Sequence, residues 1–254
     1  MMEGDSMQQP HILLRPGDVS KYIILAGDPG RILRLANFLD SYEELAYNRE
    51  FRTIRGSYKG VDITATSTGI GAPSAAICME ELIACGGKYF IRIGSGGAVQ
   101  PYIKLGDLVI STAAVREDGT SRMYVEASYP AVADLELTKV IIDTCKELSF
   151  PYHSGLTRSH DSFYIDNEKE IVDYWNKKNI LSSDMETAIV FTLAQLRAVK
   201  AASILNTVVE FDDDVKSGIE GYVNKEASTI EGEKREIMLA LESIFRLEKI
   251  SLKG

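Results

Sequence analysis

Apolar positions along this chain follow two alternating patterns. Short runs of apolar and β-branched residues predict buried strands, and apolar residues three and four positions apart predict helices. Both patterns recur along the whole chain without a break in composition or an internal repeat. The predicted strands cover residues 22–26, 51–57, 61–67, 90–93, 108–115, 152–157, 179–183 and 200–209, and the predicted helices cover residues 31–39, 74–85, 133–148, 168–178, 184–196 and 231–247.

This alternation predicts one α/β domain over residues 1–254, with a flexible start at residues 1–9. A chain of 254 residues is long enough for one such domain with a substantial core. In open α/β sheets, ligands bind beyond the carboxyl ends of the strands. We therefore expect the functional residues in the loops that follow the strands.

One predicted strand contains a charged residue among its apolar ones. Arg92 stands between Ile91 and Ile93, and the glycine-rich residues 94–97 follow, where we expect the chain to turn. A buried guanidinium group requires an anionic partner or a polar cavity. Backbone N–H groups of a glycine-rich turn bind anions readily. Two interpretations stay open at this point: half of a phosphate site, or a strand end whose arginine pairs with a nearby carboxylate.

A second strand-to-helix loop carries similar chemistry. Residues 27–31 (GDPGR) follow the first strand and lead into a helix, whose N-terminal N–H groups favour an anion. Arg31 lies in the first helical turn, where its charge is opposed by the helix dipole. Its alternative role is that of an ordinary surface arginine. The loop lacks the spacing of a P-loop or of a dinucleotide-binding fingerprint.

Charge and cysteine content narrow the function classes. The net charge of −9 disfavours binding to nucleic acid or to an anionic membrane surface. The three cysteines, Cys78, Cys85 and Cys145, have no metal-ligand or redox spacing, as expected of reduced thiols. No signal peptide or membrane-spanning apolar run is visible. These features favour a cytoplasmic protein.

Several motifs in order along the chain resemble those of the nucleoside phosphorylase family, in the branch of hexameric uridine phosphorylases and bacterial-type purine nucleoside phosphorylases. Within it, residues 99–101, 112–119 and 130–134 are most similar to uridine phosphorylases. The resemblance implies a three-layer αβα sandwich around a mixed, partly barrel-like sheet. The matching motifs are residues 27–31 (GDPGR), 48–51 (NREF), 67–74 (STGIGAPS), 92–98 (RIGSGGA), 161–164 (DSFY) and 185–186 (ME).

The resemblance also assigns roles to individual residues. It implies that phosphate is held by Gly27, Arg31, Arg92 and Ser95, and by Arg49 from a neighbouring subunit. It implies that Met185 and Glu186 hold the ribose, with His11 reaching it from a neighbouring subunit. A potassium ion would lie between subunits at Glu50, Ile70 and Ser74.

On the base side, the resemblance implies that Phe163 packs against the base, but the remaining positions depart from the family. Asn167 and Lys169 stand where uridine phosphorylases usually have glutamine and arginine. Glu210, with Asp212 two residues further on, stands near the aspartate with which the purine enzymes protonate the base. Asp184 replaces the usual glutamate before Met185.

The function implied is phosphate-dependent cleavage of the N-glycosidic bond of uridine, giving the free base and ribose 1-phosphate. Inorganic phosphate would be the co-substrate, and no cofactor would be required. The expected assembly is a homo-oligomer, a hexamer built of dimers. The first alternative is a purine nucleoside or methylthioadenosine phosphorylase. The second, which the motifs favour less, is a non-catalytic nucleoside-binding protein.

Overall fold

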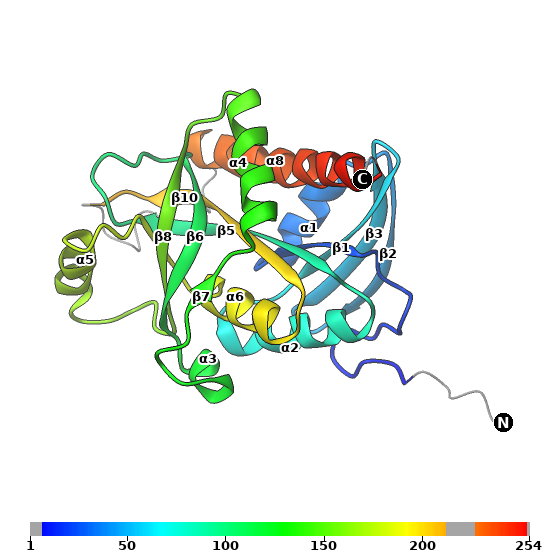
Figure 1. Ribbon diagram of the computed structural model, residues 1–254, viewed down its shortest axis with the longest axis horizontal. Coiled ribbons are helices and arrows are strands. Elements are labelled where there is room, and N and C mark those ends of the chain that lie inside the picture. Colours follow the sequence, from blue (N-terminus) through cyan, green and yellow to red (C-terminus); the bar gives the residue numbers. More distant parts are fainter. Residues whose placement is uncertain (1–6, 212–226, 253–254) are drawn as a thin grey trace.

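The computed structural model describes residues 7–211 and 227–252, and a mixed β-sheet runs through its centre (Figure 1). The strands are β1 (Tyr22–Ala26), β2 (Ser41–Asn48), β3 (Phe51–Tyr58), β4 (Val61–Ser67), β5 (Tyr89–Ala98), β6 (Leu108–Glu117), β7 (Ala131–Val132), β8 (Tyr152–His160), β9 (Ser182–Asp184) and β10 (Lys200–Val209). The helices are α1 (Pro29–Ala36), α2 (Ala72–Ala84), α3 (Gly119–Tyr124), α4 (Leu135–Glu147), α5 (Glu168–Asn176), α6 (Thr187–Leu196) and α8 (Ala227–Ser251).

Part of the sheet closes on itself. The strands β10, β6, β8, β9 and β5 pair in that order, and β5 pairs again with β10. From β5 the sheet continues outward through β1, β4, β3 and β2. Parallel pairs, such as β1 with β5 and β5 with β10, occur beside antiparallel ones, such as β10 with β6. The mixed, partly barrel-like sheet implied by the family resemblance is therefore confirmed.

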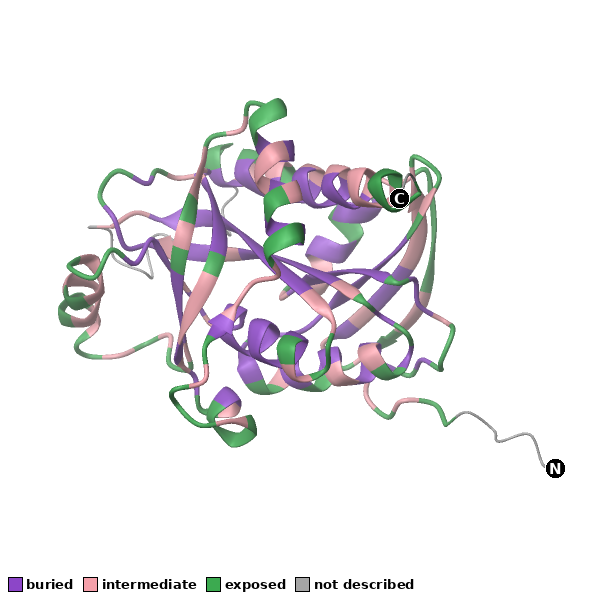
Figure 2. Ribbon diagram, in the orientation of Figure 1, coloured by how far each residue is buried: buried purple, intermediate pink, exposed green. Residues whose placement is uncertain are grey.

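Helices cover the two faces of this sheet. One layer contains α1, α4 and α8, and the other contains α2 and α6 (Figure 1). Each layer has its own hydrophobic core against the sheet. Buried residues are concentrated in the central strands and in α6, whereas α5 has none (Figure 2). The arrangement confirms the predicted three layers, and it places α5 at the margin of the molecule.

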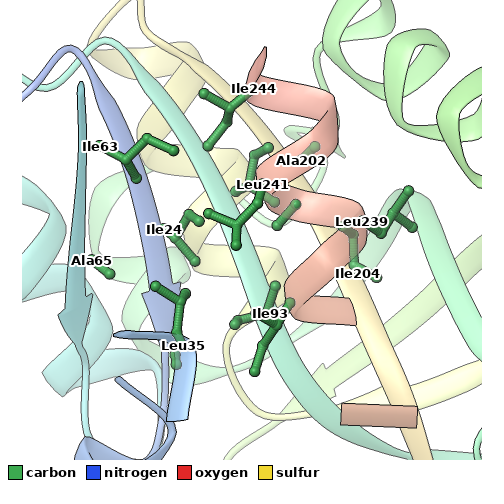
Figure 3. Packing of buried hydrophobic residues seen from close by; sticks show 14 of the residues in the cluster. Ile24, Leu35, Ile63, Ala65, Ile93, Ala202, Ile204, Leu239, Leu241 and Ile244 are labelled. Carbon is green, nitrogen blue, oxygen red and sulfur yellow. The ribbon is translucent and has the colours of Figure 1, made fainter. Parts of the chain in front are cut away.

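The long helix α8 packs closely on the central strands. Leu241 of α8 faces Ile24 of β1, with Ile93 of β5 on one side of them and Ile244 of α8 on the other (Figure 3). All four residues are at most 1% exposed. Burial of side chains of this size stabilises the fold by about 1.5–3 kcal/mol each. The packing fixes α8 against the strand that carries Arg92.

Most of the predicted elements are confirmed, with small shifts at their ends. The helix α1 begins at Pro29 instead of residue 31, because Asp28 caps it by accepting a hydrogen bond from the Gly30 N–H. Proline suits this first position. The sequence patterns missed β2, which is largely exposed, and the short elements α3 and β7. The expected flexible start at residues 1–9 lies mostly outside the described residues.

The turn predicted at residues 94–97 is wrong. These residues continue β5, because β10 pairs with them on one side and β9 pairs with Gly97 on the other. The glycines let neighbouring side chains lie close to the backbone. A Cβ atom at Gly94 would lie 2.6 Å from the Arg92 guanidinium nitrogen Nη2, and one at Gly96 would lie 2.5 Å from the Ser182 hydroxyl.

In the described part of the chain, every helix is too short or too polar to span a lipid bilayer.

Gly232, on the face of α8 turned toward β10, is equally restricted. A Cβ atom there would lie 2.0 Å from Oδ1 of Asn206, a fully buried side chain that donates to the Thr229 carbonyl. In an isolated helix, alanine is about 1 kcal/mol more favourable than glycine. Overpacking a tight contact costs about 1–3 kcal/mol in addition to the disturbed hydrogen bond. We therefore expect Gly232→Ala to lower the free energy of unfolding, measured by urea denaturation.

The control for this prediction is Glu231→Ala, on the same helix but with an exposed side chain. It should change the free energy of unfolding by less than about 0.5 kcal/mol. A Gly232→Ala variant at least as stable as the wild type would contradict the close contact between α8 and β10.

Candidate active site

A cavity of about 870 Å³ lies at the carboxyl ends of β1, β5 and β10. Cavities that bind small molecules have volumes in this range. Residues that follow β1 line it together with the last residues of β5 and β10. This is the edge of the sheet at which the alternation of strands and helices predicted a ligand site. The four phosphate residues predicted on one subunit all line the cavity: Gly27, Arg31, Arg92 and Ser95.

Arg92 lies within β5 and is only 3% exposed. Its Nε donates to the Asp184 carboxylate at 3.1 Å, and its Nη2 donates to the Glu186 carboxylate at 2.6 Å. Burial lowers the pKa of Arg92, but the two carboxylates outweigh it, and the net change is upward. The two interpretations left open by the sequence are therefore compatible, since Arg92 pairs with carboxylates and also lines the cavity.

Arg31, in the first turn of α1, is equally buried. Its Nη2 donates to the Ser95 hydroxyl at 2.9 Å and its Nε to Glu233 at 3.1 Å. A second carboxylate, that of Glu236, lies 3.2 Å from its Nη1. The alternative of a surface arginine is therefore wrong. The carboxylates offset the unfavourable position of the guanidinium group in the helix dipole.

The two carboxylates that face Arg31 belong to α8 and were not anticipated from the sequence. Glu233 and Glu236 are three residues apart, so both lie on one face of the helix. The available signal was that both fall on the apolar face of the helix, next to Ile237, where a charged residue needs a partner. The pattern gave no means of choosing Arg31 as that partner.

The ribose residues predicted from the resemblance, Met185 and Glu186, also line the cavity, between β9 and α6. Besides its pair with Arg92, the Glu186 carboxylate accepts a hydrogen bond from the Gly71 N–H at 2.5 Å. Burial raises the pKa of Glu186, and the positive charge of Arg92 opposes the rise. A buried carboxylate acceptor beside the phosphate residues suits the hydroxyl groups of a sugar.

Asp184 links Arg92 to β8 and to the start of α6. Its carboxylate accepts hydrogen bonds from Arg92, from the Ser159 hydroxyl at 2.5 Å, and from the N–H and hydroxyl of Thr187 at 3.0 and 2.6 Å. The bonds from Thr187 satisfy polar groups at the start of α6, as a capping carboxylate does. The Asp184 carboxylate therefore both orients the Arg92 guanidinium group and caps the N-terminus of α6.

Only one of the predicted base residues, Phe163, lines this cavity. Asn167 lines a smaller neighbouring cavity of about 340 Å³. Lys169 is exposed, and its ammonium group lies 3.7 Å from Asp173. The cavity is also lined by residues that the sequence did not indicate, among them His160, Tyr164, Glu168, Val208 and Val209.

His160 is the polar residue of this group that borders both cavities. Its Nδ1 is buried and has no hydrogen-bond partner. Burial lowers the pKa of His160, and the positive charge of Arg158 lowers it further. A neutral imidazole presents one donor and one acceptor to its surroundings. The only sequence signal for His160 is its position directly before the motif at residues 161–164.

Neither acidic candidate for base protonation lines the cavity in the described part of the chain. Glu210 follows β10, and its carboxylate accepts a hydrogen bond from the Leu105 N–H at 3.3 Å. It is not among the lining residues of the cavity. Asp212 lies outside the described residues. A role for either in base protonation stays a prediction.

Glu50, Ile70 and Ser74 lie together at the margin of the cavity, which all three line. The Ser74 hydroxyl donates to the Glu50 carboxylate at 2.8 Å. A hydrogen bond from its own backbone and the one from Ser74 lower the pKa of Glu50. Oxygen ligands of this kind suit a hard cation. In residues 7–211 and 227–252, no cluster of three or more His, Cys, Asp or Glu residues could hold a metal ion.

The two residues assigned to a neighbouring subunit, His11 and Arg49, do not line the cavity of their own chain. Arg49 is exposed, in the left-handed region (φ 54°) of the tight connection between β2 and β3. His11 Nδ1 lies 2.6 Å from Glu81, and the Asn48 side chain donates to its carbonyl group. Both residues therefore lie on one side of the molecule, beside the hairpin.

Comparison with known proteins agrees with this geometry. The family model described as "Phosphorylase superfamily" matches residues 21–235. Uridine phosphorylase of Thermococcus kodakarensis is 45% identical over 208 residues, which are 77% of this chain and 75% of that protein. Guanosine phosphorylase of Halorubrum lacusprofundi is 42% identical over 197 residues, which are 78% of this chain and 81% of that protein.

A solved structure is similarly close. The crystal structure of uridine phosphorylase from Vibrio fischeri ES114 covers 96% of this chain and 100% of its own, with 43% identity and a TM-score of 0.89. The chain belongs to the phosphorylase superfamily. The resemblance read from the motifs is therefore confirmed, and so is the fold that it implied.

Asp184 provides a test of how the arginine site is held. Removal of its carboxylate leaves buried donors of Arg92 and Thr187 without their acceptor, so Asp184→Ala should reduce the free energy of unfolding by about 2 kcal/mol or more. Urea denaturation measures this change. In the control Asp143→Ala, an exposed pair with Lys139 is lost, and the cost should stay below about 0.5 kcal/mol. Equal costs for the two variants would refute the dual role of Asp184.

Proposed function

We propose that this protein is a nucleoside phosphorylase that converts uridine and inorganic phosphate to uracil and ribose 1-phosphate. One observation carries the proposal: the buried guanidinium groups of Arg31 and Arg92 reach the same cavity, beside the Ser95 hydroxyl and the Glu186 carboxylate. Membership of the phosphorylase superfamily and the similarity to two uridine phosphorylases support it.

Phosphate binding follows from the chemistry of the two arginines. Planar guanidinium groups donate paired hydrogen bonds that match a phosphate dianion, and lysine would do so less well. The Ser95 hydroxyl and the backbone N–H groups near Gly27 add neutral donors. The Glu186 carboxylate, which pairs with Arg92, then lies next to the bound anion and on the side where the sugar binds.

The chemical step requires no covalent intermediate on the enzyme. As the bond between C1′ and the base breaks, the base leaves with the electron pair and takes up a proton from solvent, and the ribose acquires oxocarbenium character. A phosphate dianion oriented beneath the ring stabilises that positive charge and then forms the new bond to C1′. Glu186 accepts hydrogen bonds from the ribose hydroxyls and holds C1′ over the phosphate. Positioning and electrostatic stabilisation supply the catalysis, and no cofactor is required.

The base side decides the substrate. Its side chains combine an aromatic ring, Phe163, with the polar groups of His160 and Glu168. The uridine enzymes among the relatives favour a pyrimidine. A purine nucleoside is the second candidate, favoured by the 42% identity with a guanosine phosphorylase. Neither base signature of the family is intact here, so the assay must include both classes.

The proposal also includes the oligomeric state, a bound potassium ion and the cellular compartment. We propose a hexamer built of dimers, in which His11 and Arg49 complete a neighbour's site. A potassium ion between subunits would take oxygen ligands from Glu50, Ile70 and Ser74, whose proximity supports it. All three cysteines are free and buried, which supports a cytoplasmic protein.

The experiment that tests the function is release of free base from uridine, thymidine, inosine, adenosine and methylthioadenosine, with and without phosphate. We expect phosphate-dependent release, with uridine as the preferred substrate. Preference for inosine or adenosine would move the assignment to the purine candidate. Release that is independent of phosphate, or no release from any of the five, would refute the proposal.

In the same assay, Arg92→Ala should lower kcat/KM at least about a thousandfold, since it removes a charged donor from the phosphate in the transition state. The control is Arg55→Ala, which breaks a surface pair with Asp62 and should leave kcat/KM within about twofold. Circular dichroism checks that both variants fold. Near-normal activity of a folded Arg92→Ala protein would contradict the assignment of the phosphate site.

Shared active sites predict complementation between inactive variants. A site uses its own Arg92 and the neighbour's Arg49, so each of Arg49→Ala and Arg92→Ala should be inactive alone. Coexpressed at equal levels, they form mixed dimers in which one site is intact, and about a quarter of the wild-type activity should return. Sedimentation should show a multiple of a dimer. An active monomer, or coexpression without recovery, would exclude shared sites.

A further inference from the structure

Beneath the proposed phosphate site, α8 carries a carboxyl group that does not line the cavity. Glu236 is fully buried, and its Oε2 accepts a hydrogen bond from the Gly94 N–H at 3.1 Å. Its Oε1 lies 3.2 Å from Nη1 of Arg31, but it has no hydrogen bond of good geometry. Glu236 therefore touches two components of the site, the Arg31 guanidinium and the strand that carries Arg92 and Ser95.

The charges around this carboxyl group come from three elements. Arg31 of α1 and Arg92 of β5 favour its ionised form, and Glu233 of α8 disfavours it. Burial is the largest influence, and with Glu233 it raises the pKa of Glu236 to about 8. The carboxyl group is thus mostly neutral at about pH 7 and mostly ionised at about pH 9, and a change of charge nearby will shift that equilibrium.

Phosphate supplies such a change. A dianion bound by Arg31 and Arg92 adds two negative charges next to the guanidinium groups that stabilise ionised Glu236. Like charges in a buried site cannot all remain ionised, and the group with the most easily raised pKa takes up a proton. Asp184 and Glu186 pair directly with Arg92, and Glu233 has two arginine partners, Arg31 and Arg34. Glu236 is held by the weakest pairing of the four.

We propose that Glu236 is a positioning residue of the phosphate site, which orients Arg31 and the Gly94 N–H and takes up one proton from solvent when the phosphate dianion binds. The inference rests on the proposed function, since it requires phosphate to bind at Arg31 and Arg92. Protonation removes the attraction between the Glu236 carboxylate and Nη1 of Arg31, and more of the positive charge of Arg31 then acts on the anion. When phosphate is consumed, the proton returns to solvent.

This coupling has a defined sign. Phosphate binds preferentially to the protein with neutral Glu236, so affinity is undiminished at low pH and is lost as the pH rises through the pKa of this group. Above it, the dissociation constant for phosphate should rise about tenfold per pH unit. The titration of phosphate itself is the same for every variant, so it cancels when variants are compared.

The direct measurement is isothermal titration of the wild-type protein with inorganic phosphate, in two buffers of different ionisation enthalpy. At about pH 9 we expect an uptake approaching one proton per phosphate bound. Glu236→Gln imitates the neutral carboxyl group, so it should bind phosphate with no proton uptake and with an affinity that does not fall between about pH 7.5 and 9. The matched control is Glu242→Gln, on the same helix, where the carboxylate contacts Tyr58 and Lys59. It should behave like the wild type.

Steady-state kinetics tests the positioning part. Glu236→Ala should raise the KM for phosphate about tenfold or more while the KM for the nucleoside changes little, and Glu236→Gln should restore a near-normal value at neutral pH. A merely structural role would change both KM values or neither, and it would not produce the difference in pH dependence between Glu236→Gln and the wild type.

The outcomes separate this inference from the proposed function. Phosphate binding by the wild type without proton uptake at about pH 9 overturns the inference and leaves the function intact. An unaltered pH dependence in Glu236→Gln also overturns it. If that variant fails to fold, the proton uptake of the wild type alone decides. Absence of phosphate binding to the wild type overturns the proposed function itself.

Discussion

The structure depends on the neutralisation of two guanidinium groups that the fold removes from water. An unpaired charge in such a position would cost more free energy than a domain can supply, so each arginine requires carboxylates at hydrogen-bonding distance. Asp184 and Glu186 provide them for Arg92, and Glu233 and Glu236 provide them for Arg31. The carboxylates come from the start of α6 and from α8. Docking of α6 therefore stabilises the charge of Arg92, and docking of α8 on the other face of the sheet stabilises that of Arg31.

The closed part of the sheet makes this arrangement rigid. The strand that carries Arg92 pairs with β10 along nearly its whole length, and on its other side with β1 at residues 89–93 and with β9 at Gly97 and Ala98. Glycines at positions 94 and 96 let a guanidinium group and a hydroxyl approach the backbone. Preorganised charges of this kind do not have to rearrange at the moment of reaction, which is the condition for strong electrostatic catalysis.

Local patterns in the sequence predicted the fold well and the site in part. The period of apolar residues located β10 and the central strands, since burial on both faces leaves a continuous apolar run. The same reasoning mistook residues 94–97 for a turn, because glycine serves close approach as well as turns and only the neighbouring strands distinguish the two. The carboxylates of α8 were missed for a related reason: a helix pattern shows that Glu236 is inward, but not what it faces. Phe163 and Tyr164 lie in the loop between β8 and α5, whose conformation follows from tertiary packing.

The pairing of Arg31 with Glu233 joins residues 202 positions apart in the chain. Contacts of such long range form late in folding, after the entropy of closing the intervening chain has been overcome. A partly folded chain that already contains the central strands thus still lacks the last anchor of its anion site. Recovery of the ability to bind phosphate then marks the completion of the native structure, and a nascent chain cannot acquire it until α8 has been synthesised.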